Sequence, residues 1–418
     1  MLSAWRSWTA NVDAVSWLAP ARLPRRRLDI GDLVDGTLHQ TPAGSCFVGE
    51  RVFPLDHRHG AHRLGEALAA PAAALALMAR DPEVRGLDPR ESVFLDTETT
   101  GLSGGTGTYV FLVGVGRFEG EAFVVRQVFM RDYAEEPALL HALDELCSSA
   151  RTLVTFNGRV FDWPLLETRY LLALRARPRL RPLAHLDLLH PARRLWRGRL
   201  ESCSLGSLER WVLGHRREDD VPGWAIPSLY FNYLRHGDCL PLRQVFRHNL
   251  HDVLSLAALV ARLGQLLGRP LDAASSAEEL LAVGRLYEEA GWDRQAVECF
   301  EYGLRLEAPA ATRATLLARL ATLHKRAGRA QLAIERWREL ARLGHGDDVG
   351  ALVELAKHFE HRQRDYQEAI DLVQQALAIV ELRALRGREP TAGLIRRELE
   401  RRLARLLRKA SAARGTLL

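Results

Sequence analysis

Two carboxylates in the segment FLDTETTGL, residues 94–102, have the spacing of a metal site. Asp96 and Glu98 are two residues apart, so on an extended strand both side chains point to the same face. Carboxylates that share a face repel each other, which raises the pKa of one of them unless a cation neutralises the pair. Because their oxygens are hard ligands, they suit Mg²⁺ or Mn²⁺ better than Zn²⁺. The pair predicts a divalent-metal site; the alternative is two solvated carboxylates on an edge strand.

Two further carboxylates lie in comparable settings. Asp162, in LVTFNGRVFDWPLLETR, follows a strand pattern and opens a helix pattern. There it would serve either the metal site or the helix dipole alone. Asp252, in VFRHNLHDVLSLAALV, lies on a long apolar helix, where an unpaired charge is costly. His248 stands one helical turn before Asp252 on the same face, and His251 directly precedes Asp252. We predict that both carboxylates join the metal site.

The four acidic residues together resemble the three motifs of the DEDD exonucleases, a superfamily with the RNase H fold. In that superfamily four carboxylates hold two divalent metal ions, which bind the attacking water and the leaving oxygen of a phosphodiester. A Tyr four residues before the last Asp, or a His five residues before it, orients or deprotonates the water. Here His248 has the spacing of the tyrosine and Arg247 that of the histidine. The resemblance implies His248 as the base or water-orienting residue, with His251 as the alternative.

Longer segments resemble the YprB-like group of RNase H-fold proteins more closely. The resemblance covers about residues 28–268, and the segments that carry it are TETTGLSGGTGTYVFLVGVG, FNGRVFDWPLLETR, VPGWAIPSLYFNYL and RHNLHDVLSLA. It implies an RNase H-like α/β fold, two Mg²⁺ or Mn²⁺ ions as cofactors, and single-stranded DNA or RNA as the partner. Several members of this group also carry tetratricopeptide-like repeats after the nuclease domain.

Candidate substrate contacts lie close to the acidic residues. Thr99 and Thr100 directly follow the first acidic pair, and Tyr109 ends the glycine-rich loop GLSGGTGTY, which we expect beside the nucleic acid. The loop lacks the GK[ST] ending of a phosphate-binding P-loop, so ATP binding is not expected. Asn157 and Phe161 match superfamily positions that approach the substrate near the scissile phosphate. The alternative is that Asn157 caps a loop and Phe161 packs in the core.

The elements that must position these residues indicate a mixed sheet covered by helices. Short apolar runs separated by glycine-rich turns predict an antiparallel meander, and strands then alternate with helices. The expected strands are Ser92–Asp96, Tyr109–Arg117, Ala122–Met130 and Thr152–Phe156. The expected helices are Gly65–Ala79, Glu136–Ala150, Phe161–Arg175, Ser204–Leu213, Ile226–Arg235 and Leu242–Leu267.

A helical repeat follows the predicted sheet. Three similar segments align with Ala296, Ala333 and Ala369 in register, at offsets of 37 and 36 residues. These offsets are close to the roughly 34-residue period of tetratricopeptide helix pairs; an irregular helical bundle is the alternative. The predicted organisation is an N-terminal extension, an RNase H-like domain, an all-α repeat region that offers a surface to a protein partner, and a basic C-terminal helix. The corresponding residues are 1–88, 89–270, 277–382 and 383–418.

Composition excludes several classes of protein. A hydrophobic fraction of 47% and a charged fraction of 26% are typical of a globular chain. No run approaches the roughly 18 apolar residues of a membrane span, and no secretory signal is visible, so we expect a cytoplasmic protein without a membrane partner. The five cysteines form no CxxC pair, which argues against disulfides and a zinc ribbon. The HRHGAH segment, with His57, His59 and His62, lacks ligand partners at zinc spacing, so no metal is expected there.

The formal net charge of +6 is unevenly distributed. Residues 169–217 contain 12 arginines and three acidic residues, a net charge of +9, and residues 383–414 carry a net charge of +8. A basic tract beside a carboxylate site suits the backbone of a nucleic acid. We expect the inner tract to bind substrate, and the alternative is codon bias toward arginine. The arginines predicted to do so are Arg193, Arg194, Arg197 and Arg199.

The predicted function is a divalent-metal-dependent 3′→5′ exonuclease that hydrolyses DNA or RNA by a two-metal mechanism. Two alternatives remain open. The first is a catalytically weak or inactive nucleic-acid-binding or scaffold protein whose helical repeats recruit partners. The second is a structure-selective endonuclease on the same fold.

Overall fold

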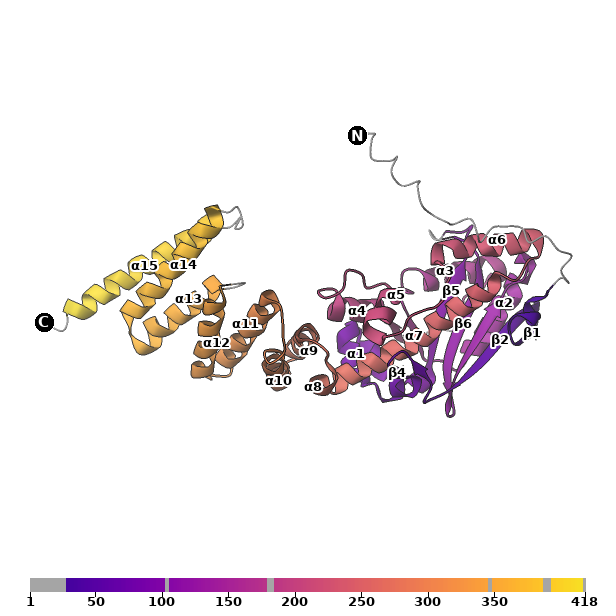
Figure 1. Cartoon of the computed structure of the whole chain (residues 1–418), viewed down its shortest axis with the longest axis horizontal. Helices are drawn as coiled ribbons and strands as arrows, with labels where there is room; N and C mark the ends of the chain where they lie inside the picture. Colours follow the sequence, from indigo (N-terminus) through magenta and orange to yellow (C-terminus); the bar gives the residue numbers. More distant parts are fainter. Residues whose placement is uncertain (1–27, 102–104, 179–183, 345–347, 386–391, 416–418) are drawn as a thin grey trace, which may run out of the picture.

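The computed structural model describes residues 28–101, 105–178, 184–344, 348–385 and 392–415. A part that contains the β-sheet and a row of helices together form an elongated molecule (Figure 1). The first 27 residues of the predicted extension lie outside the described residues. So do residues 102–104 of the glycine-rich loop and, in the predicted basic tail, 386–391 and 416–418.

Seven strands form one mixed sheet in the order β1-β2-β7-β6-β5-β8-β9. β5, β8 and β9 run parallel, whereas the other pairs are antiparallel. The β5–β6 and β6–β7 pairs form the predicted meander. β1 and β2 come from the segment expected as an N-terminal extension, so the sheet begins earlier than the predicted domain. The strands are β1 (Gly36–Thr41), β2 (Gly44–Pro54), β5 (Ser92–Thr99), β6 (Val110–Glu119), β7 (Ala122–Phe129), β8 (Thr152–Thr155) and β9 (Ala184–Asp187), and a separate hairpin pairs β3 (Arg58–His59) with β4 (His62–Arg63).

Helices cover both faces of this sheet. Side chains alternate along β5, so that Phe94 packs with α7 and Leu95 packs with α2 and α3. The helices of this part are α1 (Ala72–Ala79), α2 (Glu136–Cys147), α3 (Asp162–Leu174), α4 (Leu189–Trp196), α5 (Leu205–Leu208), the π-helical turn η6 (Glu209–Leu213), α6 (Ile226–His236), α7 (Leu242–Gly268) and α8 (Pro270–Ala273).

The expected helix Gly65–Ala79 is interrupted. A 3₁₀ helix, Leu64–Ala69, comes first, and α1 begins only after Pro71. Proline cannot donate the backbone hydrogen bond that a continuous helix needs at that position. β9 and α4 were not predicted, because four residues of β9 are too few for an alternating pattern to be visible.

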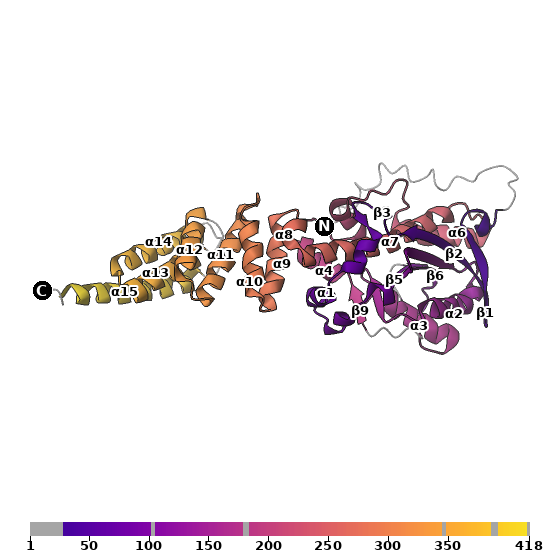
Figure 2. The same cartoon turned by 90° about the horizontal axis from the view of Figure 1, so that it is seen from below.

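α7 is the central helix of the molecule (Figures 1 and 2). It is long and apolar enough to cross a membrane by length and composition, but 89% of its most apolar window is buried inside the protein. Two glycines of β6 let it approach the sheet. A Cβ at Gly114 would lie 2.3 Å from Asn249 Oδ1, and one at Gly116 would lie 2.6 Å from Val253 Cγ1. The polar face of α7 is therefore held directly above β5 and β6.

Among the described residues after α8, all the regular structure is helical, as predicted. Ala296, Ala333 and Ala369 lie buried on α10, α12 and α14, each of which packs against neighbouring helices. The first helix, α9, shares its hydrophobic core with α7, so the helical row continues directly from the sheet-containing part (Figure 2). The helices are α9 (Ala277–Glu289), α10 (Asp293–Gly303), α11 (Ala310–Arg326), α12 (Ala330–Leu343), α13 (Asp348–His358), α14 (Tyr366–Leu385) and α15 (Ala392–Gly415).

Candidate active site

Glu98, His248 and Asp252 converge at one point of the sheet-containing part. Each offers one ligand atom, and the three atoms lie within 4.8 Å of one another. Glu98 is on β5, whereas His248 and Asp252 are one turn apart on α7, which packs on that face of the sheet. A cavity of about 690 Å³ lies beside them, and Asp96 also lines it. Residues that the sequence predicted on a strand and on a helix therefore meet in space.

Asp96 is held by an amide of α7. Asn249 Nδ2 donates a hydrogen bond to Asp96 Oδ2 at 2.9 Å, and Asn249 Oδ1 accepts one from Gln127 Nε2, also at 2.9 Å. Gln127 thereby fixes which end of the amide faces Asp96. The carboxylate is oriented by two buried side chains that sequence reasoning did not select.

Asp162 approaches β5 from the opposite side. It is the first residue of α3 and accepts a hydrogen bond from Thr97 Oγ1, whose side chain points away from the face of Asp96 and Glu98. Asp162 is therefore outside the group of three that share the 4.8 Å sphere. Burial raises the pKa of Asp162 to about 6, and the negative charge of Asp162 contributes to the raised pKa values of Asp96 and Glu98.

The carboxylates are buried in a way that favours a cation. Burial, together with the charge of Asp252, raises the pKa of Asp96 well above its usual range and that of Glu98 to about 8. Glu98 Oε1 is buried and has no hydrogen-bond partner among the described residues. A buried carboxylate oxygen without a donor, next to other carboxylates, is suited to a hard divalent cation. The residues present therefore fit Mg²⁺ or Mn²⁺.

Arg217 supplies a positive charge beside these carboxylates. Its guanidinium donates to Asp252 and to both oxygens of the buried Glu209, at 2.7 Å from Nε to Oε2. A third carboxylate, Asp220, accepts from Nη1 at 3.2 Å. Glu209 belongs to the π-helical turn η6, a rare conformation that is frequent at functional sites. The loop after η6 thus delivers a cation to the same side of Asp252 as His248.

The two candidate bases have different surroundings. Although burial opposes it, the hydrogen bond to Asp220 and the charges of Asp252 and Glu98 raise the pKa of His248 to about 9. His248 Nδ1 lies 2.8 Å from Asp220, and Nε2 lies 3.3 Å from Asp252. His251 does not join the acidic group: it lines a different cavity, and burial lowers its pKa to about 4. Of the two, only His248 is at the carboxylates.

The predicted substrate contacts are only partly close to the site. Thr99 Oγ1 donates to Gly101 O, and Thr100 Oγ1 accepts from the backbone N–H of Tyr109 at 2.9 Å, so both threonines shape the turn after β5. The Tyr109 ring is covered by the guanidinium of Arg169 at 3.9 Å.

Asn157 and Phe161 lie in the turn between β8 and α3. Asn157 is exposed, has a φ of 64°, and donates its backbone N–H to Asp187 at 2.8 Å. Phe161 is partly exposed and directly precedes Asp162, and its N–H donates to Asn157 O at 3.2 Å. The turn thus positions Asp162, and both side chains are accessible from outside.

The predicted arginines lie on or just after α4, away from the residues that line the acidic cavity. Arg194 donates to the carbonyl groups of Leu77 and Met78, and Arg199 lies 3.5 Å from Glu279. Arg193 and Arg197 are exposed. Arg194 and Arg199 therefore have structural partners within the chain. Of the four arginines, only Arg193 and Arg197 are left to contact a ligand.

Sequence reasoning missed the residues that orient the acids. Asn249 had a signal, because it stands three residues before Asp252 on the same helix and is polar within an apolar stripe. Arg217 and Asp220 had none, because they follow the expected helix Ser204–Leu213 in a segment without a periodic pattern. Glu209 lies within that expected helix, but its contact with Arg217 depends on the tertiary fold.

Comparison with known proteins agrees with this architecture. Residues 93–264 match the RNase_H_2 family of the RNase_H superfamily, a range that begins in β5 and ends in α7. The strands from β5 onward and the acidic group thus belong to a domain of the RNase H superfamily. The chain is also 32% identical over 377 residues to "Uncharacterized protein YprB" of Bacillus subtilis (strain 168), covering 88% of this chain and 87% of that protein. The chain belongs to the YprB family, as the sequence motifs predicted.

Among solved structures, a family B DNA polymerase from the hyperthermophilic archaeon Pyrobaculum calidifontis is 18% identical, with a TM-score of 0.31. The match covers 48% of this chain and 29% of that chain.

Proposed function

We propose that this protein is a divalent-metal-dependent nuclease, and specifically a 3′→5′ exonuclease on single-stranded DNA or RNA. The observation that carries the proposal is the group of Glu98, His248 and Asp252, with Asp96 beside it and an unpartnered buried oxygen on Glu98. Membership of the RNase H superfamily supports it. Asp96, Glu98 and Asp252 would hold two Mg²⁺ or Mn²⁺ ions together with Asp162, which is outside the group of three but near enough for its charge to raise the pKa of Asp96 and Glu98.

Two such ions would supply activation of a water and stabilisation of the leaving oxygen of a phosphodiester. The chain's own contribution is orientation: Asn249 holds Asp96, and Thr97 holds Asp162. His248 stands where it contacts Asp252, and its raised pKa keeps it protonated at neutral pH in the metal-free protein. Added positive charge at the carboxylates would lower that pKa, which favours His248 as the group that accepts or orients a proton of the water.

The rim of the acidic cavity offers features that suit a single strand. Trp211 and Trp224 are 56% and 68% exposed, and each directly follows a residue that lines the cavity, Arg210 and Gly223 respectively. Exposed tryptophans are unusual, and base stacking on aromatic rings is a common mode of single-strand binding. Arg210 lies over the ring of Trp211 at 4.9 Å and adds a positive charge for the phosphate backbone.

One observation favours a second candidate, a nucleic-acid-binding scaffold with weak or no catalysis. Arg217 already neutralises Asp252 and Glu209, so part of the site is satisfied without a metal ion. In that case the helical row, which we propose to be tetratricopeptide-like, would recruit a protein partner.

The test is a nuclease assay with end-labelled substrates. The protein is incubated with 5′- and 3′-labelled single- and double-stranded DNA and RNA in Mn²⁺ or Mg²⁺, and product sizes are measured. We expect mononucleotides released from the 3′ end, with activity falling to background in Asp96→Asn and in Asp252→Asn. Glu121→Gln, at an exposed acid in the turn between β6 and β7, is the matched control and should keep full activity.

Internal cuts in both labelled strands would instead indicate an endonuclease. Binding of single strands without cleavage, together with no Mn²⁺ uptake, would favour the scaffold and overturn the nuclease proposal.

A further inference from the structure

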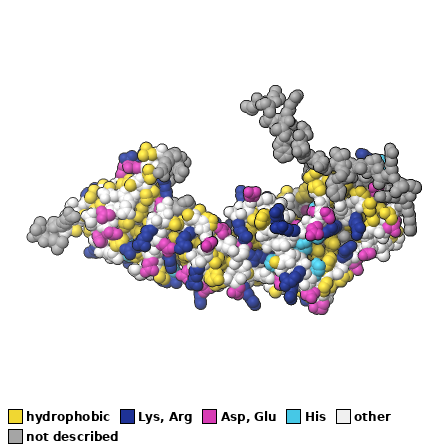
Figure 3. Space-filling model, viewed as in Figure 1, with side chains coloured by type: hydrophobic (Ala, Val, Ile, Leu, Met, Phe, Trp, Pro, Cys, Tyr) yellow, Lys and Arg dark blue, Asp and Glu magenta, His cyan; other side chains and the backbone are white. Residues whose placement is uncertain are grey.

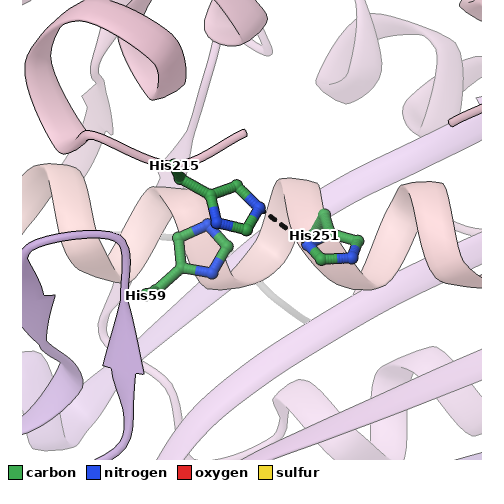
Figure 4. Close-up of side chains that lie close together, drawn as sticks. All are labelled: His59, His215 and His251. Atoms are coloured by element: carbon green, nitrogen blue, oxygen red, sulfur yellow. Dashed lines mark hydrogen bonds between the residues drawn. The ribbon is translucent and has the colours of Figure 1, made fainter. Parts of the chain in front are cut away.

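A second group of ligand-type side chains lies outside the acidic group, although one of its members, His215, also lines the acidic cavity. His59, His215 and His251 each offer one ring nitrogen, and these atoms lie within 4.8 Å of one another (Figure 4). They come from three separate elements: the short strand β3, the loop after η6, and α7. No two of them are close enough in sequence to suggest a common site, so only the fold assembles them.

The spacing within the group suits a shared ion. His215 Nε2 lies 3.1 Å from His251 Nδ1. The rings of His59 and His215 are stacked with their centroids 3.9 Å apart, so their in-plane lone pairs do not converge, and the ring of His215, which is on a loop, must turn before both can bind one ion. Two nitrogens bound to one tetrahedral zinc ion, at Zn–N distances of about 2.0–2.1 Å, lie roughly 3.3 Å apart. The His215–His251 hydrogen bond therefore already has nearly the nitrogen–nitrogen spacing of two ligands of one metal.

The third histidine is held in one tautomer. Ser255 Oγ donates its single hydrogen to Glu209, so at its 2.7 Å contact with His59 Nε2 it must accept. His59 therefore carries its proton on Nε2, which leaves Nδ1 with a free lone pair. A ligand histidine whose other nitrogen donates to a fixed acceptor is the usual arrangement at metal sites. His59 is only 2% exposed, so this orientation is enforced by packing.

The group also has an access route. All three histidines line a cavity of about 800 Å³, together with His57 and Asp219. Histidine side chains reach the surface of the sheet-containing part, next to arginines, on the face seen in Figure 3. Three protein ligands at the wall of an open cavity leave a fourth position for water or a small ligand.

We infer that His59, His215 and His251 form a transition-metal site that takes Zn²⁺, distinct from the acidic site. Imidazole nitrogens prefer zinc, whereas a set of carboxylates prefers Mg²⁺ or Mn²⁺. The inference does not depend on nuclease activity. It assigns the ion a positioning role, because the loop that carries His215 also carries Arg217 and Asp220, the partners of Asp252 and His248. Zinc would fasten this loop to both the β3–β4 hairpin and α7.

The test measures zinc binding by the full chain without a histidine tag. The protein is stripped with a chelator, titrated with Zn²⁺, and its bound zinc is measured by mass spectrometry; Co²⁺ is then added and its visible spectrum recorded. We expect one zinc per chain and the intense visible bands of tetrahedral cobalt. His215→Ala, in a loop, and His251→Gln should each weaken zinc binding at least about tenfold, and Ser255→Ala should weaken it about 10- to 100-fold.

Three controls make the outcome decisive. His57→Ala lines the same cavity but is outside the group, and it should bind zinc as the wild type does. Asp252→Asn should also keep its zinc, which separates this site from the acidic one whatever the result of the nuclease assay. Circular dichroism shows whether each variant is folded. The proposal is overturned if the wild type binds no zinc, or if folded His215→Ala and His251→Gln bind it unchanged.

Discussion

At the scale of single residues, the site is a balance between buried carboxylates and the groups that offset them. The acidic residues themselves could be predicted. Asp96 and Glu98 are indicated by their spacing, and Asp252 is indicated by its position on an apolar helix. Their partners could not. Arg217 reaches Asp252 from 35 residues away in the chain, and nothing in its own segment indicates that contact.

The raised pKa of Glu98 gives a testable dependence of stability on pH. The pKa of Glu98 is about 8 in the folded protein, against 4.5 for an ordinary glutamate side chain. Between pH 4.5 and pH 8, Glu98 is therefore protonated in the folded protein and ionised in the unfolded chain. The contribution of Glu98 to stability is therefore largest below pH 4.5, and this contribution is lost as the pH rises through 8. We expect the melting temperature of the metal-free protein to fall across this window, and less steeply in Glu98→Gln.

The measurement is thermal unfolding in chelator from pH 5 to 8.5. Glu121→Gln serves as the control, with the wild-type slope. Equal slopes in Glu98→Gln and the wild type would show that Glu98 does not titrate in this window. Addition of Mn²⁺ should flatten the wild-type slope, because the cation replaces the proton.

At the scale of elements, one helix on one sheet creates the site. The sequence predicted α7 and the strands β5, β6, β7 and β8 within a few residues, because their apolar patterns are visible in a single sequence. It did not predict β1 and β2, which lie in the segment expected as an extension. It also did not predict β9, α4 or the break at Pro71, where short length or a single proline decides the local structure. The sequence also did not show that two glycines of β6 allow α7 to pack close to the sheet.

Gly114 provides a test of that approach. A Cβ at this position would meet Asn249 Oδ1 at 2.3 Å and Val253 Cγ2 at 2.7 Å, neither of which can move without shifting α7. We expect Gly114→Ala to lower the free energy of unfolding by about 1–3 kcal/mol and to reduce nuclease activity by displacing Asn249 from Asp96. Urea unfolding measures the first effect. At Gly86 an added Cβ meets nothing within 4 Å, so Gly86→Ala should change neither the free energy of unfolding nor the nuclease activity.

At the scale of the whole molecule, the helical row is fastened to the sheet-containing part by a buried ion pair. Arg262 of α7 donates two hydrogen bonds to Glu279 of α9, at 2.8 and 2.7 Å, and Trp196 of α4 donates a third at 2.8 Å. The C-terminal basic tract is similarly used within the chain, since Arg402, Arg405 and Lys409 all bind the buried Glu360. The net charge of that tract therefore overstates what it offers to a nucleic acid.

Glu279→Ala should loosen the junction. Its side chain is 1% exposed, and its removal leaves Arg262 buried without its charge partner, so we expect a loss of about 3–5 kcal/mol in unfolding free energy. Limited proteolysis should also cut faster between α8 and α9. Glu298→Ala is the matched control on α10: its pair with Arg294 is exposed, and its loss should change stability by less than about 1 kcal/mol. Equal stability of both variants would mean that the junction relies on apolar packing alone.

The guanidinium of Arg217 has a consequence for how the protein is made. Small zinc domains remain unfolded until their ion arrives, because the free energy of metal binding supplies their free energy of folding. Here the chain carries its own counter-charge for Asp252 and Glu209. We therefore expect newly synthesised molecules to fold before any cation is supplied, and to stay folded when the cation is withdrawn.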